Sequence, residues 1–83
     1  MELYIARDIS GIRFFKDCPD LVRFSTDSPI EWTGYPVNFG DFPEIKTFIE
    51  QSKPVQNYLN NYEDEEIVAP LHLKIEGLKI KVL

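Results

Sequence analysis

The sequence contains a single cysteine, Cys18, and a single histidine, His72, in 83 residues. One cysteine cannot form an intrachain disulfide, and this absence favours a reducing compartment. Structural zinc needs about four nitrogen or sulfur ligands, more than these two residues supply. A dyad of Cys18 with His72 is conceivable because the order of such partners along a chain is free. An incidental loop cysteine and an exposed strand histidine explain both residues more simply, so we predict no catalytic residue, no metal site, no cofactor and no enzymatic activity.

Long apolar runs and basic stripes are also missing. No apolar stretch approaches the roughly 20 residues that cross a bilayer, and the N-terminus lacks the basic region and apolar run of a signal peptide. Without a stripe of basic residues, the chain has nothing with which to replace the counterions of a nucleic acid. We therefore expect a cytoplasmic protein that binds neither membranes nor nucleic acids.

The length predicts one domain, residues 1–83. A chain of this size buries only about 60–65% of its unfolded surface, so its stability margin is thin. With no disulfide to supplement the core, formation of a homo-oligomer is a natural alternative.

A helical pattern extends from Asp41 to Tyr62, where apolar residues recur at spacings of three and four. Asp41 is predicted to cap the helix, with Pro43 in its first turn. Pro54 removes one backbone donor and crowds the preceding turn, so we expect a kink or two short helices. The apolar face contains Ile45, Phe48, Ile49, Val55, Tyr58, Leu59 and Tyr62.

Two strands are predicted near the N-terminus, at residues 3–7 and 12–16, joined by a type I turn with a glycine bulge at Gly11. This geometry pairs Asp8 with Ile12 and Ile5 with Phe15. Apolar residues then occupy both faces: Leu3, Ile5 and Phe15 on one, and Tyr4, Ala6, Ile12 and Phe14 on the other. We expect the pair to be covered on both sides, or left open on one side for self-association or a partner.

Further strands are predicted at residues 21–25 and 30–35, and a C-terminal hairpin at residues 71–75 and 78–82 with Glu76-Gly77 as its turn. In this hairpin Leu73 opposes Ile80 and Lys74 opposes Lys79, and Gly77 takes a positive φ. The predicted fold class is α+β: a small antiparallel sheet of four to six strands with one kinked helix or two short helices packed on one face. The sheet contains the N-terminal hairpin, one or two middle strands and the C-terminal hairpin.

The opening residues Tyr4-Ile5-Ala6-Arg7-Asp8, followed by Gly11 and Phe14-Phe15, resemble short uncharacterised reading frames of gut anaerobes and their phages. Those reading frames begin with a Tyr-Ile-Ala-Arg-Asp hairpin. The resemblance covers residues 1–16, with a weaker echo at residues 42–44. It implies a phage or mobile-element context and no particular activity.

Two features are candidates for binding. Trp32 and Tyr35 lie in a loop-rich segment, where they either cap the core or anchor an interface, as Trp and Tyr often do. The acidic run of Glu63, Asp64, Glu65 and Glu66 either solvates a loop or steers a basic partner surface.

The predicted function is that of a small, non-catalytic protein-binding module, such as a phage or mobile-element inhibitor of a host protein. Its binding residues would be Trp32, Tyr35, Glu63, Asp64, Glu65 and Glu66. The alternative is an oligomeric protein that binds or sequesters a nucleotide-like ligand, using Arg7, Arg13 or Arg23 with aromatic residues at a subunit interface.

Overall fold

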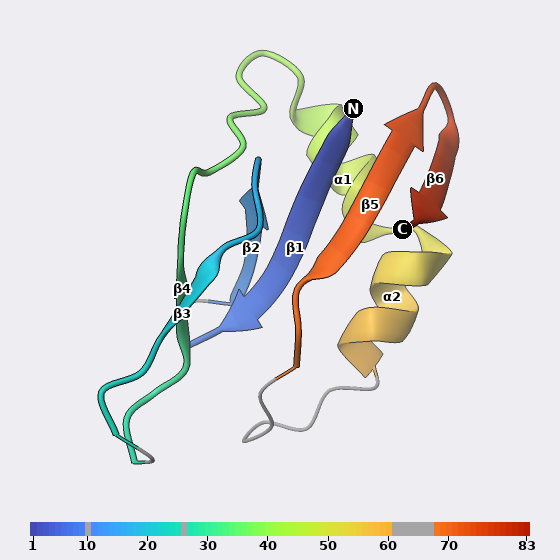
Figure 1. The fold of residues 1–83 in the computed structure, drawn as a ribbon. Helices are drawn as coiled ribbons and strands as arrows, with labels where there is room; N and C mark the ends of the chain where they lie inside the picture. The colour runs from blue at the N-terminus through green and yellow to red at the C-terminus, as the bar shows by residue number, and fades with distance from the viewer. Residues whose placement is uncertain (10, 26, 61–67) are drawn as a thin grey trace.

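The computed structural model describes residues 1–9, 11–25, 27–60 and 68–83 (Figure 1). Its elements follow one another as β1 (Glu2–Asp8), β2 (Gly11–Phe15), β3 (Asp20–Val22), β4 (Glu31–Thr33), α1 (Pro43–Glu50), α2 (Lys53–Asn60), β5 (Leu71–Glu76) and β6 (Lys79–Val82).

The main sheet joins the two ends of the chain. Its strand order is β2-β1-β5-β6, and every neighbouring pair is antiparallel. The N-terminal and C-terminal hairpins meet where β1 pairs with β5, with Leu3 opposite Leu73. The helices lie against one face of this sheet (Figure 1), so the predicted α+β class is confirmed.

The middle strands β3 and β4 pair with each other in a separate two-stranded sheet, whereas the sequence placed them in the main one. The outer edge of β2 is already bonded to the segment that follows β4. The Lys16 N–H donates to the Tyr35 carbonyl at 2.8 Å, and the Val37 N–H donates to the Phe14 carbonyl at 3.0 Å. Because this segment occupies the edge, β3 and β4 lie across the sheet as a hairpin of their own.

The register predicted for the N-terminal hairpin is wrong by one residue. Asp8 pairs with Gly11, and Ile5 pairs with Phe14. The predicted register would have set Arg7 opposite Arg13, and like charges directly opposite each other destabilise a strand pair. The observed register sets Arg13 opposite Ala6 instead and exchanges the faces on which Phe14 and Phe15 lie.

The helical stretch forms two short helices, one of the two predicted forms. α1 ends at Glu50 and α2 begins at Lys53, one residue before Pro54. The predicted cap at Asp41 is wrong: Phe42 occupies the N-cap position without a side-chain bond, because the helix begins at Pro43. None of the described helices is long and apolar enough to cross a membrane.

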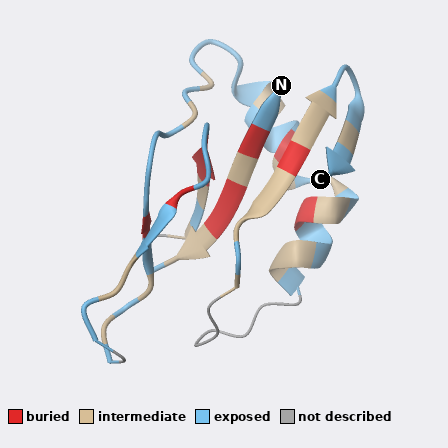
Figure 2. Ribbon diagram, viewed as in Figure 1, coloured by how far each residue is buried: buried red, intermediate tan, exposed pale blue. Residues whose placement is uncertain are grey.

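The described residues form two hydrophobic clusters, one on each face of β1 and β2. Figure 2 marks the buried residues of both strands in red. The first lies under the helices and contains Leu3, Ile5, Phe14, Ile49, Val55 and Leu73. The second lies under the β3–β4 hairpin and contains Ala6, Phe15 and Trp32. The strand pair is therefore covered on both sides within one chain, and the argument for self-association through this pair is removed. Of the predicted helical stripe, Phe48 is exposed, and Tyr62 lies outside the described residues.

The C-terminal hairpin forms, with a register two residues away from the predicted one. Leu73 pairs with Val82 and Ile75 with Ile80, so the turn consists of Gly77 and Leu78. Gly77 has φ +58° as predicted, and no other kind of residue in the described chain has a positive φ. A positive φ at the first turn position alone is typical of a type II′ turn, which favours Gly there. A shift of two residues leaves the apolar face intact but sets Lys74 opposite Lys81.

Candidate functional site

The predicted binding residues are found in different environments. Trp32 is only 7% exposed and packs against Ala6 and Phe15, so its ring belongs to the second cluster. Tyr35 is 71% exposed. The acidic run, residues 63–66, lies outside the described residues. Of the predicted set, Tyr35 is the side chain that the structure places at the surface.

A buried carboxylate fixes the β3–β4 hairpin to the main sheet. The side chain of Asp8 is 1% exposed, and its Oδ2 accepts the backbone N–H of Trp32 at 3.0 Å. The Nη1 of Arg13 lies 3.4 Å from the same oxygen and also donates to the Trp32 carbonyl. The Arg13 guanidinium lies 5.0 Å from the centre of the Phe15 ring, in cation–π geometry. Both the N–H and the carbonyl of Trp32 in β4 are thus bonded to side chains of the N-terminal hairpin.

Large apolar side chains are exposed along this hairpin. Phe24, two residues beyond β3, is 91% exposed, and Leu21 within β3 is also exposed. Tyr35 follows at the opposite end, two residues beyond β4. Sequence reasoning missed Phe24 because it placed that residue in a strand ending at Ser25. The turn cluster in the sequence at residues 26–29, directly after that predicted strand, was the feature that could have revealed it.

The connection that carries Phe24 is closed by its own hydrogen bonds. The Ser28 N–H donates to the Ser25 carbonyl at 3.1 Å, and the Ser25 N–H donates to the Ser28 Oγ at 3.1 Å. The Nε of Arg23 donates to the Ser28 carbonyl at 3.2 Å. These bonds tie Ser25 and the Arg23 side chain, the two neighbours of Phe24, to Ser28, while the Phe24 ring faces solvent.

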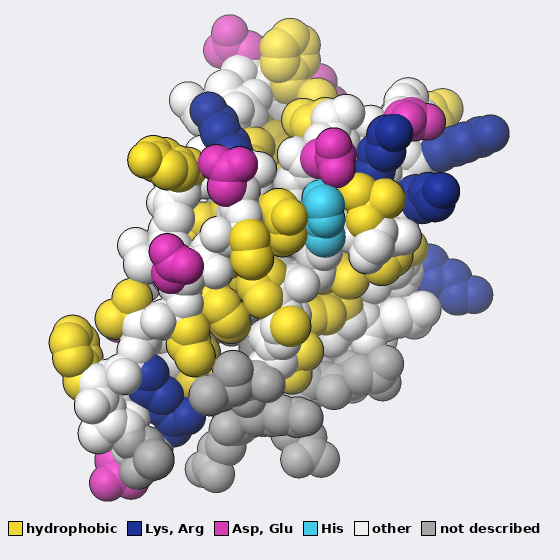
Figure 3. Space-filling view, in the orientation of Figure 1, with side chains coloured by type: hydrophobic (Ala, Val, Ile, Leu, Met, Phe, Trp, Pro, Cys, Tyr) yellow, Lys and Arg dark blue, Asp and Glu magenta, His cyan; other side chains and the backbone are white. Residues whose placement is uncertain are grey.

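Charge is distributed unevenly over the molecule. The stretch from residue 17 to residue 33, which includes the β3–β4 hairpin, has four acidic residues and one basic residue: Asp17, Asp20, Asp27 and Glu31 against Arg23. The C-terminal hairpin has three lysines and one glutamate. Figure 3 shows lysine side chains gathered at the side where β5 and β6 lie. The β3–β4 hairpin is therefore suited to a basic partner surface.

The face of the main sheet opposite the helices carries the histidine. The His72 ring stacks on Tyr4, with centroids 4.2 Å apart and an angle of 11° between the planes. Its Nε2 lies 3.2 Å from the Oε1 of Glu2. The thiol of Cys18 lies near its neighbouring carbonyl at Pro19, and no hydrogen bond joins it to His72 in the described chain. Within the same residues, no three His, Cys, Asp or Glu side chains gather to hold a metal ion.

The chain matches no family model, and comparisons with curated proteins and with solved structures give no match either. Functional inference therefore depends on this chain's own residues and geometry.

Proposed function

We propose that this protein is a small, non-catalytic module that binds another protein through its β3–β4 hairpin. The observation that carries the proposal is the 91% exposure of Phe24 on a hairpin whose base is anchored by Asp8, Arg13 and Trp32. An exposed aromatic ring on a fixed backbone offers contact area at little cost in conformational entropy. Tyr35 would extend the contact at the other end of the hairpin.

The partner surface would be an apolar pocket with a basic rim. Large rings supply the desolvated centre of an interface, while exposed carboxylates outside it mainly raise the association rate. Asp20, Asp27 and Glu31 are exposed on and beside the hairpin. The run Glu63–Glu66 stays a predicted contributor to the same steering. An inhibitor of a host protein, encoded by a phage or mobile element, would be a module of this kind.

The nucleotide-like ligand alternative receives less support from the geometry. Arg13 is bonded to Asp8 and to the Trp32 carbonyl, and Arg23 is bonded to the Ser28 carbonyl. A phosphate would have to compete with these internal acceptors for the guanidinium groups of Arg13 and Arg23, and Arg7 stays a predicted contact of this alternative.

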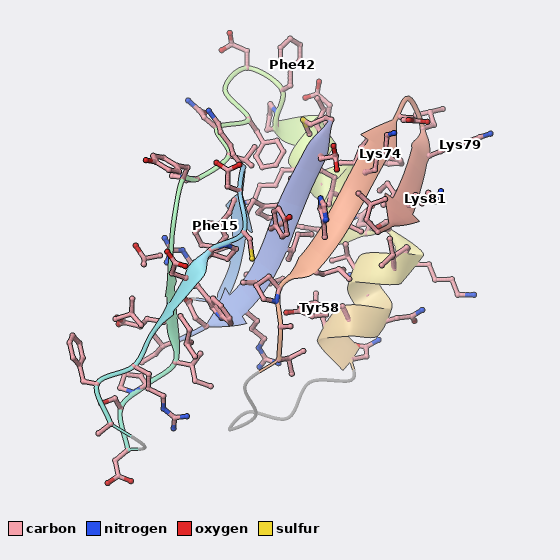
Figure 4. All side chains as sticks on the ribbon, viewed as in Figure 1. Phe15, Phe42, Tyr58, Lys74, Lys79 and Lys81 are labelled. Atoms are coloured by element: carbon pink, nitrogen blue, oxygen red, sulfur yellow. The ribbon has the colours of Figure 1, made fainter. Side chains whose placement is uncertain are left out.

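The test compares tagged wild-type protein with Phe24→Ala and Tyr35→Ala in quantitative pull-downs from host lysate. Phe42→Ala serves as the matched control, because Phe42 is also exposed but lies in the loop before α1, far along the chain (Figure 4). We expect a partner that both hairpin variants lose by about tenfold or more, as hot-spot truncations do, and that the control keeps. Equal recovery by all variants, or equal loss in the Phe42→Ala control, would contradict binding through the hairpin. Thermal unfolding of each variant checks that none of them is simply unfolded.

A further inference from the structure

The two edges of the main sheet differ. The β2 edge is bonded to residues 35–37, as described above. At the other edge, the Leu83 N–H donates to the His72 carbonyl at 3.0 Å, which makes these two residues a hydrogen-bonded pair. Backbone direction alternates along a strand, so Lys79 and Lys81 turn their backbone groups toward β5, while Ile80 and Val82 turn theirs outward. Among the described residues, no backbone group bonds to this outer side of β6.

Two rows of charged side chains cross the sheet, and both end in a lysine at this edge. One row crosses Glu2, Lys74 and Lys81, and the next crosses Glu76 and Lys79. The Oε1 of Glu76 lies 3.0 Å from the Nζ of Lys74. Glu76 is the strand partner of Lys79, but among the described residues no ion pair joins a carboxylate to Lys79 or Lys81. Both lysines are exposed and project from β6 (Figure 4). Because like charges opposite each other destabilise a strand pair, Lys74 beside Lys81 favours a negative group in the next position of the row.

The other face of β6 has apolar side chains at the edge. Ile80 packs against the first hydrophobic cluster and is only half-buried. Val82, two residues further along the strand, is about half exposed on the same face. A neighbouring strand with apolar residues on this face would cover them.

We propose that β6 is a docking edge for an extended segment of a partner protein, which adds to the main sheet as its next strand. Lys79 and Lys81 are two residues apart, so the segment would carry Asp or Glu at positions i and i+2, with an apolar residue between them. Its backbone would bond to Ile80 and Val82. This surface is separate from the β3–β4 hairpin, and the proposal does not depend on the function proposed above.

A second copy of this chain fits the edge poorly. Pairing β6 with β6 of another copy, with apolar faces matched, sets lysines opposite lysines. None of the described strands carries carboxylates two residues apart. Lysines at an edge also prevent accidental self-pairing, so the same two side chains select against a copy and in favour of an acidic strand.

The test uses a synthetic eight-residue peptide in which glutamate alternates with valine, measured by fluorescence anisotropy. Two matched peptides accompany it: one with lysine in place of glutamate, and one N-methylated on the backbone edge that would face β6. We expect the glutamate peptide to bind and the other two to fail. Lys79→Glu combined with Lys81→Glu should weaken binding of the glutamate peptide by about tenfold or more. The control Lys16→Glu with Lys53→Glu has the same change in net charge at exposed sites elsewhere and should keep it.

Amide hydrogen exchange locates the contact. In the free protein the amides of Ile80 and Val82 should exchange rapidly, and the glutamate peptide should protect both. No binding at millimolar peptide, or binding that N-methylation leaves unchanged, would overturn the proposal. If the amides of Ile80 and Val82 become protected as the protein concentration rises without peptide, the edge binds a second copy of the chain instead. A large gain in peptide affinity after neutralising Glu63, Asp64, Glu65 and Glu66 would assign it to the chain's own acidic run.

Discussion

The side chain of Asp8 joins the β3–β4 hairpin to the main sheet. Its carboxylate is buried and accepts bonds from both Arg13 and the backbone of Trp32. Asp8→Ala leaves the Trp32 N–H without its acceptor and Arg13 without its carboxylate, and we expect a loss of about 2 to 3 kcal/mol in the free energy of unfolding. Urea titration measures the loss. Asp17→Ala, at an exposed position, should change stability by less than about 0.5 kcal/mol. Equal effects of the two variants would mean that Asp8 does not hold the hairpin.

Substitutions of Trp32 test whether its buried ring contributes to stability through packing rather than through a hydrogen bond. Trp32→Ala should cost about 3 to 5 kcal/mol, because it empties the second cluster. Trp32→Phe should cost much less, because the buried indole Nε1 has no hydrogen-bond partner in the described chain and phenylalanine removes that unsatisfied donor. Thermal unfolding of both variants compares them. Nearly wild-type stability in Trp32→Ala would return this residue to the predicted interface.

Gly77 is required for its backbone rather than for space. A Cβ at this position would meet no atom within 4 Å, so the penalty of Gly77→Ala comes from its φ of +58° alone. We expect a loss of about 1 kcal/mol. Gly77→Asn should lose less, since Asn tolerates positive φ better than Ala. Chemical denaturation distinguishes the two, and equal losses would indicate that the turn relaxes on substitution.

Among the elements, we expect the break between α1 and α2 to persist when Pro54 is replaced. Pro54 is the second residue of α2, where a backbone N–H has no partner within the helix. Pro54→Ala should therefore change stability by less than about 0.5 kcal/mol and leave the helix content seen by circular dichroism unchanged. Ile49→Ala, at a fully buried position of α1, should cost about 2 to 5 kcal/mol. A clear rise in helix content in Pro54→Ala would show that the proline alone separates α1 from α2.

The sequence predicted the elements well and their registers poorly, for physical reasons. Periodicity identifies a strand and its faces, but it does not determine the length of a turn. In the N-terminal hairpin both faces are apolar, so a shift by one residue exchanges Phe14 for Phe15 with no change in hydrophobicity. In the C-terminal hairpin a shift by two residues preserves the alternation, and only the position of Gly77 within the turn differs. Trp32 illustrates the same limit at the candidate site, because a large aromatic ring suits a core and an interface equally well.

For the whole molecule, the separation of an acidic hairpin from a basic edge should determine how fast it meets partners. Replacing Asp20, Asp27 and Glu31 with Asn and Gln should slow association of the hairpin partner at low salt. The effect should fade once the Debye length falls below about 10 Å. Neutralising Glu63–Glu66 should act similarly if that run contributes. Stopped-flow association rates at several salt concentrations provide the measurement, with Lys79→Gln and Lys81→Gln as the control. If association slows equally at all salt concentrations, the substitutions have removed direct contacts rather than long-range electrostatic attraction.

The central position of β1 also affects how the protein is made. β1 leaves the ribosome well before β5, which pairs with it and begins at Leu71. At about 5 to 20 residues per second, β1 waits roughly 3 to 14 seconds for that neighbour. Until then Leu3 and Ile5 lack one side of their packing, and pairing across so long a stretch of chain is slow in itself. Nascent copies therefore expose an apolar strand for seconds before its second neighbour is made.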